Sequence, residues 1–139
     1  MAKPEVTIAT INWNGGNYVK TFFESVKSQD FPKEKMEVLM VDYGSTDGSL
    51  EFVKENFPFV KIIEKEKNYG FATACNIAFD AAEANLFLTT GNDTIMPENF
   101  VSSMVSEIRK TKSAVVVAKD YPMGGSLDVP RQRDTVNIV

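Results

Sequence analysis

The sequence has four short polar segments whose residues could do chemistry, and each one follows an apolar run. These segments are residues 12–16, 42–48, 68–71 and 91–94. The 139-residue chain contains no histidine, so acid–base or metal chemistry has to use carboxylates. Oxygen ligands suit magnesium or manganese better than zinc. We therefore interpret the segments as candidates for binding a ligand through carboxylate and amide groups, with a divalent cation as cofactor.

Asp42 is the first of two acidic candidates in these segments. It ends the apolar run 38–41, and a carboxylate in that position can accept the imide N–H of a pyrimidine base. The alternative is local, because Gly44 and Ser45 follow and an aspartate before such residues often closes a turn or caps a helix. The sequence leaves both interpretations open.

Asp93 is the second acidic candidate. With Asn92 beside it, Asp93 offers oxygen ligands to a divalent cation that also binds diphosphate oxygens, as magnesium sites usually do. The alternative is that Asp93 caps a helix. Pro97 and Glu98 together predict the first turn of such a helix, since proline lacks an N–H and an acid suits the helix dipole.

Two alternating periods predict the elements that position these segments. Short apolar runs predict strands at 6–11, 38–41, 59–63, 86–88 and 114–117. Apolar spacings of three and four predict helices near 19–26, 50–57, 74–81 and 100–108. This order is typical of an α/β protein with a mostly parallel sheet and helices on both faces. Ligands of such sheets bind beyond the carboxyl ends of the strands, where the polar segments would meet.

Composition excludes several classes of protein. Hydrophobic residues make up 43% and charged residues 24% of the chain, and its length fits one domain. The formal charge of −4 does not favour nucleic-acid binding, which needs a basic stripe. We find no signal peptide and no run long enough to be transmembrane, so we expect a cytoplasmic protein, with peripheral contact to a membrane allowed. The one cysteine, Cys75, is expected in the core.

Taken together, the polar segments resemble a known family. The runs TINWNGG, VDYGSTDGSLEFV, EKNYGFATACNIA and LTTGNDTIMP occur in the order and spacing of the amino-terminal half of family-two glycosyltransferases. The later run AKDYPMGGSL is similar to the rhamnosyltransferase-like branch of that family, and the resemblance covers about residues 5 to 128. It implies the Rossmann-like, nucleotide-binding half of the GT-A fold.

The resemblance also assigns roles to the candidate residues. It implies that Asp42 binds the base of a uridine or thymidine nucleotide, and that Asp93 binds Mg²⁺ or Mn²⁺ with Asn92 before it. The other residues that it places along the nucleoside, the ribose and the diphosphate are Thr10, Asn12, Asn14, Asn68 and Gly70. The metal ion would neutralise the charge that develops on the departing nucleoside diphosphate.

The sequence departs from the family pattern at several positions. Tyr43 stands where relatives usually have asparagine, and Asn92 stands where a second acid is frequent. The acidic pair that supplies the general base in inverting relatives has no counterpart, so the catalytic residue is unknown. We interpret residues 1–119 as a nucleotide-sugar-binding α/β domain and residues 120–139 as a loop or tail, the truncated start of the acceptor-side region.

Two hypotheses about function follow from these observations. The first is a metal-dependent glycosyltransferase that moves a sugar from a UDP- or dTDP-sugar to a glycan or lipid-linked acceptor, with inversion. The alternative is a non-catalytic or truncated nucleotide-sugar-binding domain that lacks the catalytic base. A generic Rossmann domain ranks behind both, because no G-x-G-x-x-G motif opens a helix. The open edge of a truncated sheet would also favour a homo-oligomer.

Overall fold

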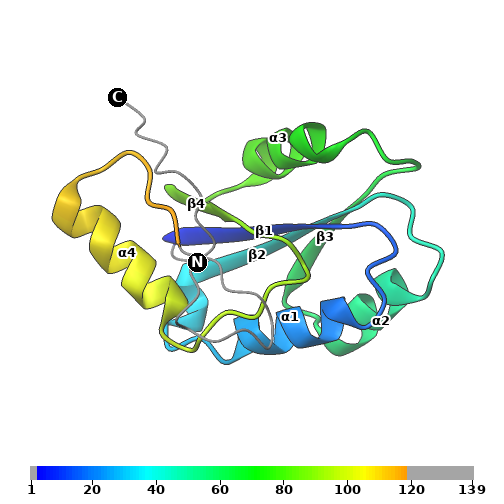
Figure 1. Cartoon of the computed structure of the whole chain (residues 1–139), viewed down its shortest axis with the longest axis horizontal. Helices are drawn as coiled ribbons and strands as arrows, with labels where there is room; N and C mark the ends of the chain where they lie inside the picture. The colour runs from blue at the N-terminus through cyan, green and yellow to red at the C-terminus, as the bar shows by residue number, and fades with distance from the viewer. Residues whose placement is uncertain (1–2, 119–139) are drawn as a thin grey trace, which may run out of the picture.

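The structure of the protein is a computed structural model that describes residues 3–118. It contains a four-stranded parallel sheet with helices between the strands (Figure 1). The strands are β1 (Val6–Asn12), β2 (Met36–Asp42), β3 (Val60–Glu64) and β4 (Leu86–Thr89). The helices are α1 (Tyr18–Lys27), the short 3-10 turn η1 (Lys33–Lys35), α2 (Ser49–Asn56), α3 (Phe71–Ala81) and α4 (Phe100–Thr111). None of these helices has both the length and the apolar character needed to cross a membrane.

The strand order places β1 between β2 and β4. The order is β3-β2-β1-β4, so successive strands are added on one side of β1 until β4, which is added on the other side. β1 pairs in parallel with both β2 and β4, and the register sets Asn12 beside Asp42. In open α/β sheets the crevice at such a reversal, outside the carboxyl ends of the strands, is where ligands bind.

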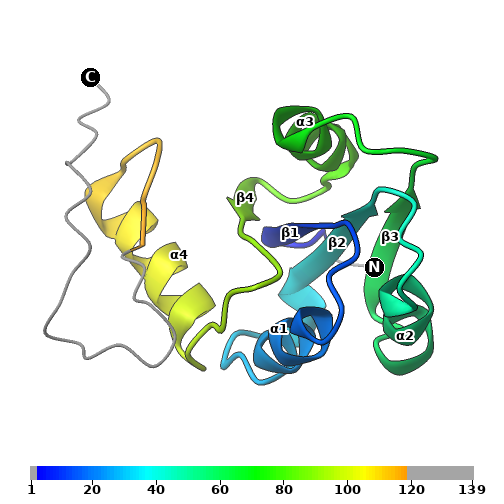
Figure 2. The same cartoon turned by 45° about the vertical axis from the view of Figure 1, so that its right-hand side comes forward.

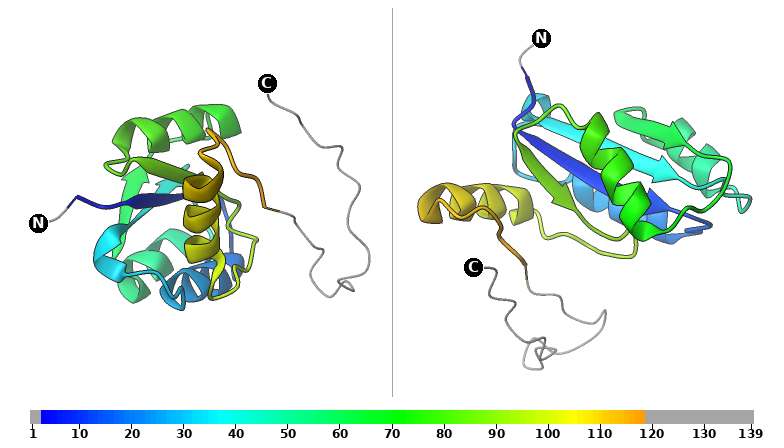
Figure 3. Two further views of the ribbon diagram at one scale, coloured as in Figure 1. Left: turned by 90° about the vertical axis from the view of Figure 1, so that its left-hand side faces the viewer. Right: turned by 90° about the horizontal axis from the view of Figure 1, so that it is seen from above.

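Different helices cover the two faces of the sheet (Figures 2 and 3). Alternate side chains of a strand point to opposite faces, so Ile8 packs with the side chains of α1, α2 and α4, while the next residue, Ala9, packs against α3. Residues of α3 that face the sheet include Ala74 and Ala78, whose small side chains let the helix approach closely. The expected α/β class, with a parallel sheet and helices on both faces, is confirmed.

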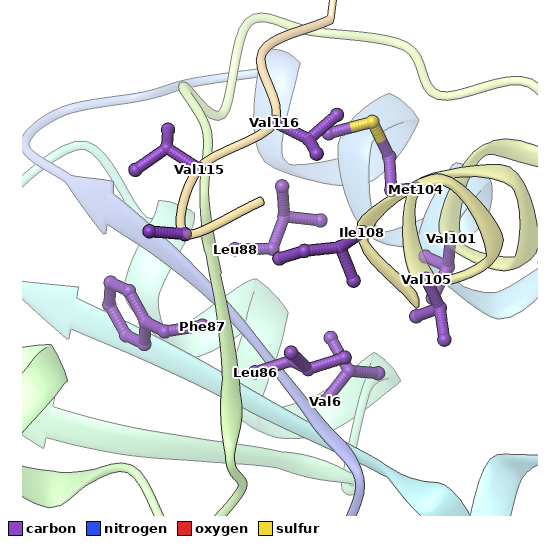
Figure 4. A pocket seen from close by; sticks show the side chains of 11 residues that line it. Val6, Leu86, Phe87, Leu88, Val101, Met104, Val105, Ile108, Val115 and Val116 are labelled. Atoms are coloured by element: carbon purple, nitrogen blue, oxygen red, sulfur yellow. The ribbon is translucent and has the colours of Figure 1, made fainter. Parts of the chain in front are cut away.

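The expected fifth strand at 114–117 is wrong, because this segment forms no ladder with the sheet. Ala114, Val115 and Val116 instead line an apolar cavity of about 150 Å³ together with side chains of β4 and α4 (Figure 4). The apolar run predicted burial, but the segment is largely exposed: the side chain of Val115 is 56% exposed and that of Val117 is 83% exposed. Within residues 3–118, the outer edge of β4 therefore has no strand beside it.

The expected start of the last helix at Pro97 is also wrong, since α4 begins at Phe100. The carbonyl of Pro97 accepts the amide of Phe100 at 2.9 Å and the side-chain amide of Gln29 at 2.8 Å. The buried Gln29 also accepts the amide of Val101 at 2.9 Å. Residues 97–99 thus form a turn that anchors α4 to the end of α1, and this long-range contact was not visible in the local pattern.

Cys75 is half-buried and does not lie in the core as expected. It lies on α3 with its Sγ 3.9 Å from the Oγ1 of Thr89, the last residue of β4. This part of α3 is more open than its helical spacing suggested, because the neighbouring side chain of Phe71 is 65% exposed.

Candidate functional site

The candidate site lies at the carboxyl edge of the sheet, where the loops after β1, β2 and β3 turn at one end of the molecule (Figure 1). Parallel pairing brings Asn12 and Asp42, the last residues of β1 and β2, to this edge. The turn 91–94 joins them from β4, because the side-chain amide of Asn92 donates to Asn12 Oδ1 at 2.8 Å. Both acidic segments singled out in the sequence thus meet at one edge.

Asp42 is fully buried and already hydrogen-bonded. Its Oδ1 accepts the Ser45 hydroxyl at 2.7 Å and the Asn12 amide at 2.8 Å, and its Oδ2 accepts the Ser45 amide at 3.0 Å. The bonds from Ser45 are those of the local turn that the sequence allowed. An ionised carboxylate has about four acceptor positions, so three are used and one remains on Oδ2. A base would reach it only after the surrounding loop shifts, because the side chain has no exposed surface.

Asn12 is the most connected side chain of the site. Its Nδ2 lies within hydrogen-bonding distance of Asp42 Oδ1 at 2.8 Å, Ser49 Oγ at 2.9 Å and Ser45 Oγ at 3.0 Å. Its Oδ1 accepts the Asn92 amide. Asn12 is fully buried, and no buried side-chain nitrogen or oxygen in the described chain lacks a partner. The polar network under the site is therefore complete, which favours a fixed arrangement.

The loops after β1 and β2 hold each other through reciprocal hydrogen bonds. The Oδ1 of Asn14 accepts the Thr46 amide at 2.8 Å, and the amide of Asn14 donates to Ser45 Oγ at 2.9 Å. Asp47 Oδ2 accepts the Gly16 amide at 2.7 Å. Asn14 reaches this geometry with a positive φ of 53°, a conformation that asparagine tolerates better than most residues. Asn14 therefore shapes the rim of the site through its side chain and its backbone.

Asp47 completes this loop contact as an ionised group. Desolvation alone would raise the pKa of its carboxyl, but hydrogen bonds from the Ser49 hydroxyl and amide and from the Gly16 amide together lower that pKa below 3.8. The same two Ser49 bonds fix the first residue of α2. The charged form of Asp47 thus stabilises both the start of α2 and the loop after β1.

Asp93, unlike Asp42, has an exposed carboxylate that a metal ion can reach. Its side chain is exposed, and no hydrogen bond to its carboxylate occurs among residues 3–118. The helix-capping alternative is wrong, since α4 starts after Asn99 and has no side-chain cap. The described residues hold no group of three or more acidic or sulfur ligands. A single free carboxylate fits a cation whose other ligands are diphosphate oxygens and water.

The remaining candidates support the site from its margins. Thr10 is buried, and its hydroxyl donates to the carbonyl of Thr90 at 2.9 Å, which ties β1 to the end of β4. Asn68 accepts the amide of Gly70 at 2.8 Å in an exposed turn. The carbonyl of Gly70 in turn accepts the Tyr43 hydroxyl at 2.9 Å. Asn68 and Gly70 are thus tied to the end of β2, and no hydrogen bond in the described chain links them to Asp42.

Sequence reasoning missed residues that the site depends on. Ser45 and Ser49 each contact Asn12. The sequence suggested Ser45 only as a turn residue, and Ser49 follows directly after the second polar segment. Gly15 was missed because what matters at this position is that glycine has no side chain. A Cβ at position 15 would clash with Asn12 Oδ1 and with Asn92 Nδ2, so the backbone passes directly over the bond between them.

Comparisons with known proteins agree with this fold. The chain is 24% identical over 121 residues to the glycosyltransferase GlyG of Streptococcus pneumoniae serotype 4, which covers 84% of this chain and 39% of GlyG. The crystal structure of Staphylococcus aureus TarS residues 1–349 with UDP-GlcNAc matches with a TM-score of 0.71 and 26% identity, over 76% of this chain and 31% of that one. The mannosyltransferase PcManGT of Pyrobaculum calidifontis, solved with GDP-Man and Mn²⁺, matches with a TM-score of 0.70 and 25% identity, over 78% and 33%.

The parallel sheet with its polar carboxyl edge is thus an α/β domain of the GT-A type. A family model for glycosyl transferase family 2 matches residues 7–137. The chain belongs to that family. It spans no more than two fifths of the length of any of the three proteins compared above.

Proposed function

We propose that this chain forms the donor-binding part of a metal-dependent glycosyltransferase that uses a nucleotide-diphosphate sugar. The observation that carries the proposal is the hydrogen-bonded line Asp42–Asn12–Asn92 at the carboxyl edge of the sheet. It joins a buried carboxylate to the turn that bears a free, exposed one, Asp93. These are the two chemistries that one nucleoside diphosphate needs: an acceptor for the base and a cation site for the phosphates.

The base is assigned to Asp42. Once the surrounding loop shifts, the unused acceptor position on its Oδ2 would take the imide N–H of a uracil or thymine, whereas cytosine has no such N–H to donate. The donor is accordingly a UDP- or dTDP-sugar. TarS, which matches this chain in fold, was solved with UDP-GlcNAc.

The diphosphate is assigned to Asp93 with Mg²⁺ or Mn²⁺. A cation held there would supply neutralisation of the charge that forms on the departing nucleoside diphosphate. The chain's own residues prepare this step: Asn12 holds Asn92, and Asn92 precedes the acid in the turn. PcManGT, a relative in fold, was solved with Mn²⁺.

The finer assignments belong to the same proposal. We propose that the protein belongs to a rhamnosyltransferase-like branch and transfers the sugar with inversion to a glycan or lipid-linked acceptor. It would contact a membrane peripherally and form a homo-oligomer. Residues 1–119 form the donor-binding domain, and residues 120–139 begin the acceptor side; residues 1–2 and 119–139 lie outside the described range. No general base is assigned.

Titration calorimetry of the full chain tests the proposal. UDP is titrated into the protein once in the presence of Mn²⁺ and once in the presence of EDTA. The proteins are the wild type, Asp93→Asn and the control Asp80→Asn, which changes an exposed acid on α3. We expect Mn²⁺ to strengthen UDP binding in the wild type and the control, and to have little effect in Asp93→Asn. Equal affinities with Mn²⁺ and with EDTA in the wild type would remove the cation from the proposal. Binding of UDP-sugar without turnover, in the presence of acceptors, would leave a donor-binding domain without catalysis.

A further inference from the structure

The side chain of Asn12 is buried and hydrogen-bonded within the protein itself. Its Nδ2 faces Asp42, Ser45 and Ser49 at 2.8–3.0 Å, and its Oδ1 accepts the amide of Asn92 at 2.8 Å. It is fully buried. A carboxamide has two donor hydrogens and an oxygen with two lone pairs; both hydrogens and one lone pair of Asn12 are used within the protein. Because the side chain is also fully buried, Asn12 presents no donor and no exposed acceptor to a ligand, although the resemblance places it along the nucleoside.

The contacts of Asn12 span the whole site. β1 is the central strand of the binding edge, with β2 on one side and β4 on the other. Through one short side chain, the end of β1 holds the carboxylate of Asp42 on β2 and the turn of Asn92 after β4. The two segments that would bind the base and the cation have no other side-chain hydrogen bond in common within residues 3–118.

A second observation points to the same pair of contacts. Gly15 lies so close to the bond between Asn12 and Asn92 that an added Cβ would overlap Asn12 Oδ1 and Asn92 Nδ2, and would lie 3.1 Å from Val19 Cγ1. The backbone of the loop after β1 thus packs directly onto this hydrogen bond. Close packing of this kind keeps the carboxamide in one rotamer and excludes water from competing for its partners.

We propose that Asn12 is a positioning residue that fixes the orientation of the Asp42 carboxylate and the location of the Asn92–Asp93 turn relative to each other. Base recognition and cation binding then take place on one nucleotide in a single geometry. The inference rests on the proposed function and deepens it, because it assigns the base preference to the orientation of Asp42 rather than to its charge alone.

The test is the base preference of the full chain, measured by calorimetry with UDP and CDP in the presence of Mn²⁺. The variant Asn12→Ala removes one of the three donors that hold the Asp42 carboxylate. We expect the ratio of UDP to CDP affinity to fall about tenfold, the size of one hydrogen bond to a charged group. The strengthening of UDP binding by Mn²⁺ should fall in the same variant. Gly15→Ala, which leaves every polar group in place but separates Asn12 from Asn92, should reduce the Mn²⁺ effect with a smaller change in base preference.

A merely structural role predicts a different outcome: a lower melting temperature with UDP and CDP weakened by the same factor. That result, or an unchanged ratio in a folded Asn12→Ala, would overturn the inference. Asn12→Thr, which suits the end of a strand but is too short to bridge both neighbours, provides a second variant with the same readout, and failure of both variants to fold would also overturn it. A wild type that binds UDP and CDP equally would instead refute the assignment of the base to Asp42, and the inference with it.

Discussion

Replacing Tyr43 with phenylalanine isolates one partly buried hydrogen bond that ties the end of β2 to the start of α3. The ring is 2% exposed and packs edge-on against Tyr69 at a centroid distance of 6.0 Å, so phenylalanine keeps the packing. What is lost is the bond from the hydroxyl to the carbonyl of Gly70 at 2.9 Å. Gly70 is exposed, so water can replace that donor. We therefore expect Tyr43→Phe to lower the free energy of unfolding by about 1 kcal/mol, or roughly 3–5 °C in melting temperature.

Urea unfolding of wild type and Tyr43→Phe measures this difference, with Tyr18→Phe as the control. Tyr18 is 55% exposed, and its replacement should change stability by less than about 0.5 kcal/mol. No difference between Tyr43→Phe and the control would refute the hydrogen bond as a stabilising contact. A loss above about 3 kcal/mol would refute the argument that water replaces the hydroxyl at Gly70.

The same residue gives a dependence on alkaline pH. Burial raises the pKa of the Tyr43 phenol above 10.0, and the neighbouring Cys75 and Tyr69 raise it further. The folded protein therefore keeps this proton where the unfolded chain has begun to lose it. The stability that Tyr43 contributes is complete below pH 10.0 and declines as the pH rises from there through the raised pKa. Stability measured from pH 9 upward should fall more steeply in the wild type than in Tyr43→Phe, and parallel curves would contradict the burial argument.

Three further substitutions test the contacts around the site. Asp47→Ala should cost about 1 kcal/mol near neutral pH, as the loss of a helix cap does, and in urea unfolding the difference from wild type should shrink as the pH falls below 3.8 through the lowered pKa of Asp47; a constant difference would contradict an ionic role. Gln29→Ala removes the buried amide between α1 and α4 and should destabilise by about 2–4 kcal/mol, with faster hydrogen exchange in α4, and unchanged exchange there would refute the anchor. Gly44→Ala places a Cβ 2.9 Å from the carbonyl oxygen of Glu66 at a φ of +70°, so it should cost about 1–3 kcal/mol in thermal unfolding; a neutral result would show that the loop shifts freely.

Much of the fold could be predicted from the sequence, because a buried parallel strand and an amphipathic helix each have a distinctive period. The runs at 6–11 and 38–41 are strands, and the spacing from Val19 to Val26 is the buried face of α1. The prediction of a strand at 114–117 was wrong because a short apolar run guarantees neither a partner strand nor burial, and Val115 and Val117 are exposed. The predicted start of α4 was wrong because the carbonyl of Pro97 accepts a hydrogen bond from a distant side chain, that of Gln29.

The candidate site could be predicted only in outline. Its acids were visible because each ends or follows an apolar run, and parallel strands bring such ends together. The bonds of Asn12 were not visible, because they depend on the register between β1 and its two neighbours. The function of Gly15 could not be predicted at all, since a glycine in a polar loop has many uses and only coordinates reveal what a Cβ would touch.

The separation of the site's partners along the chain has a consequence for folding. Asn12 bonds to residues 30 and 80 positions away, and parallel strands need a crossover before each pairing. Contacts of such long range form late and slowly. The complete binding edge therefore exists only once β4 has docked, so a bound nucleotide would select fully folded molecules and shift the equilibrium toward them in proportion to its concentration.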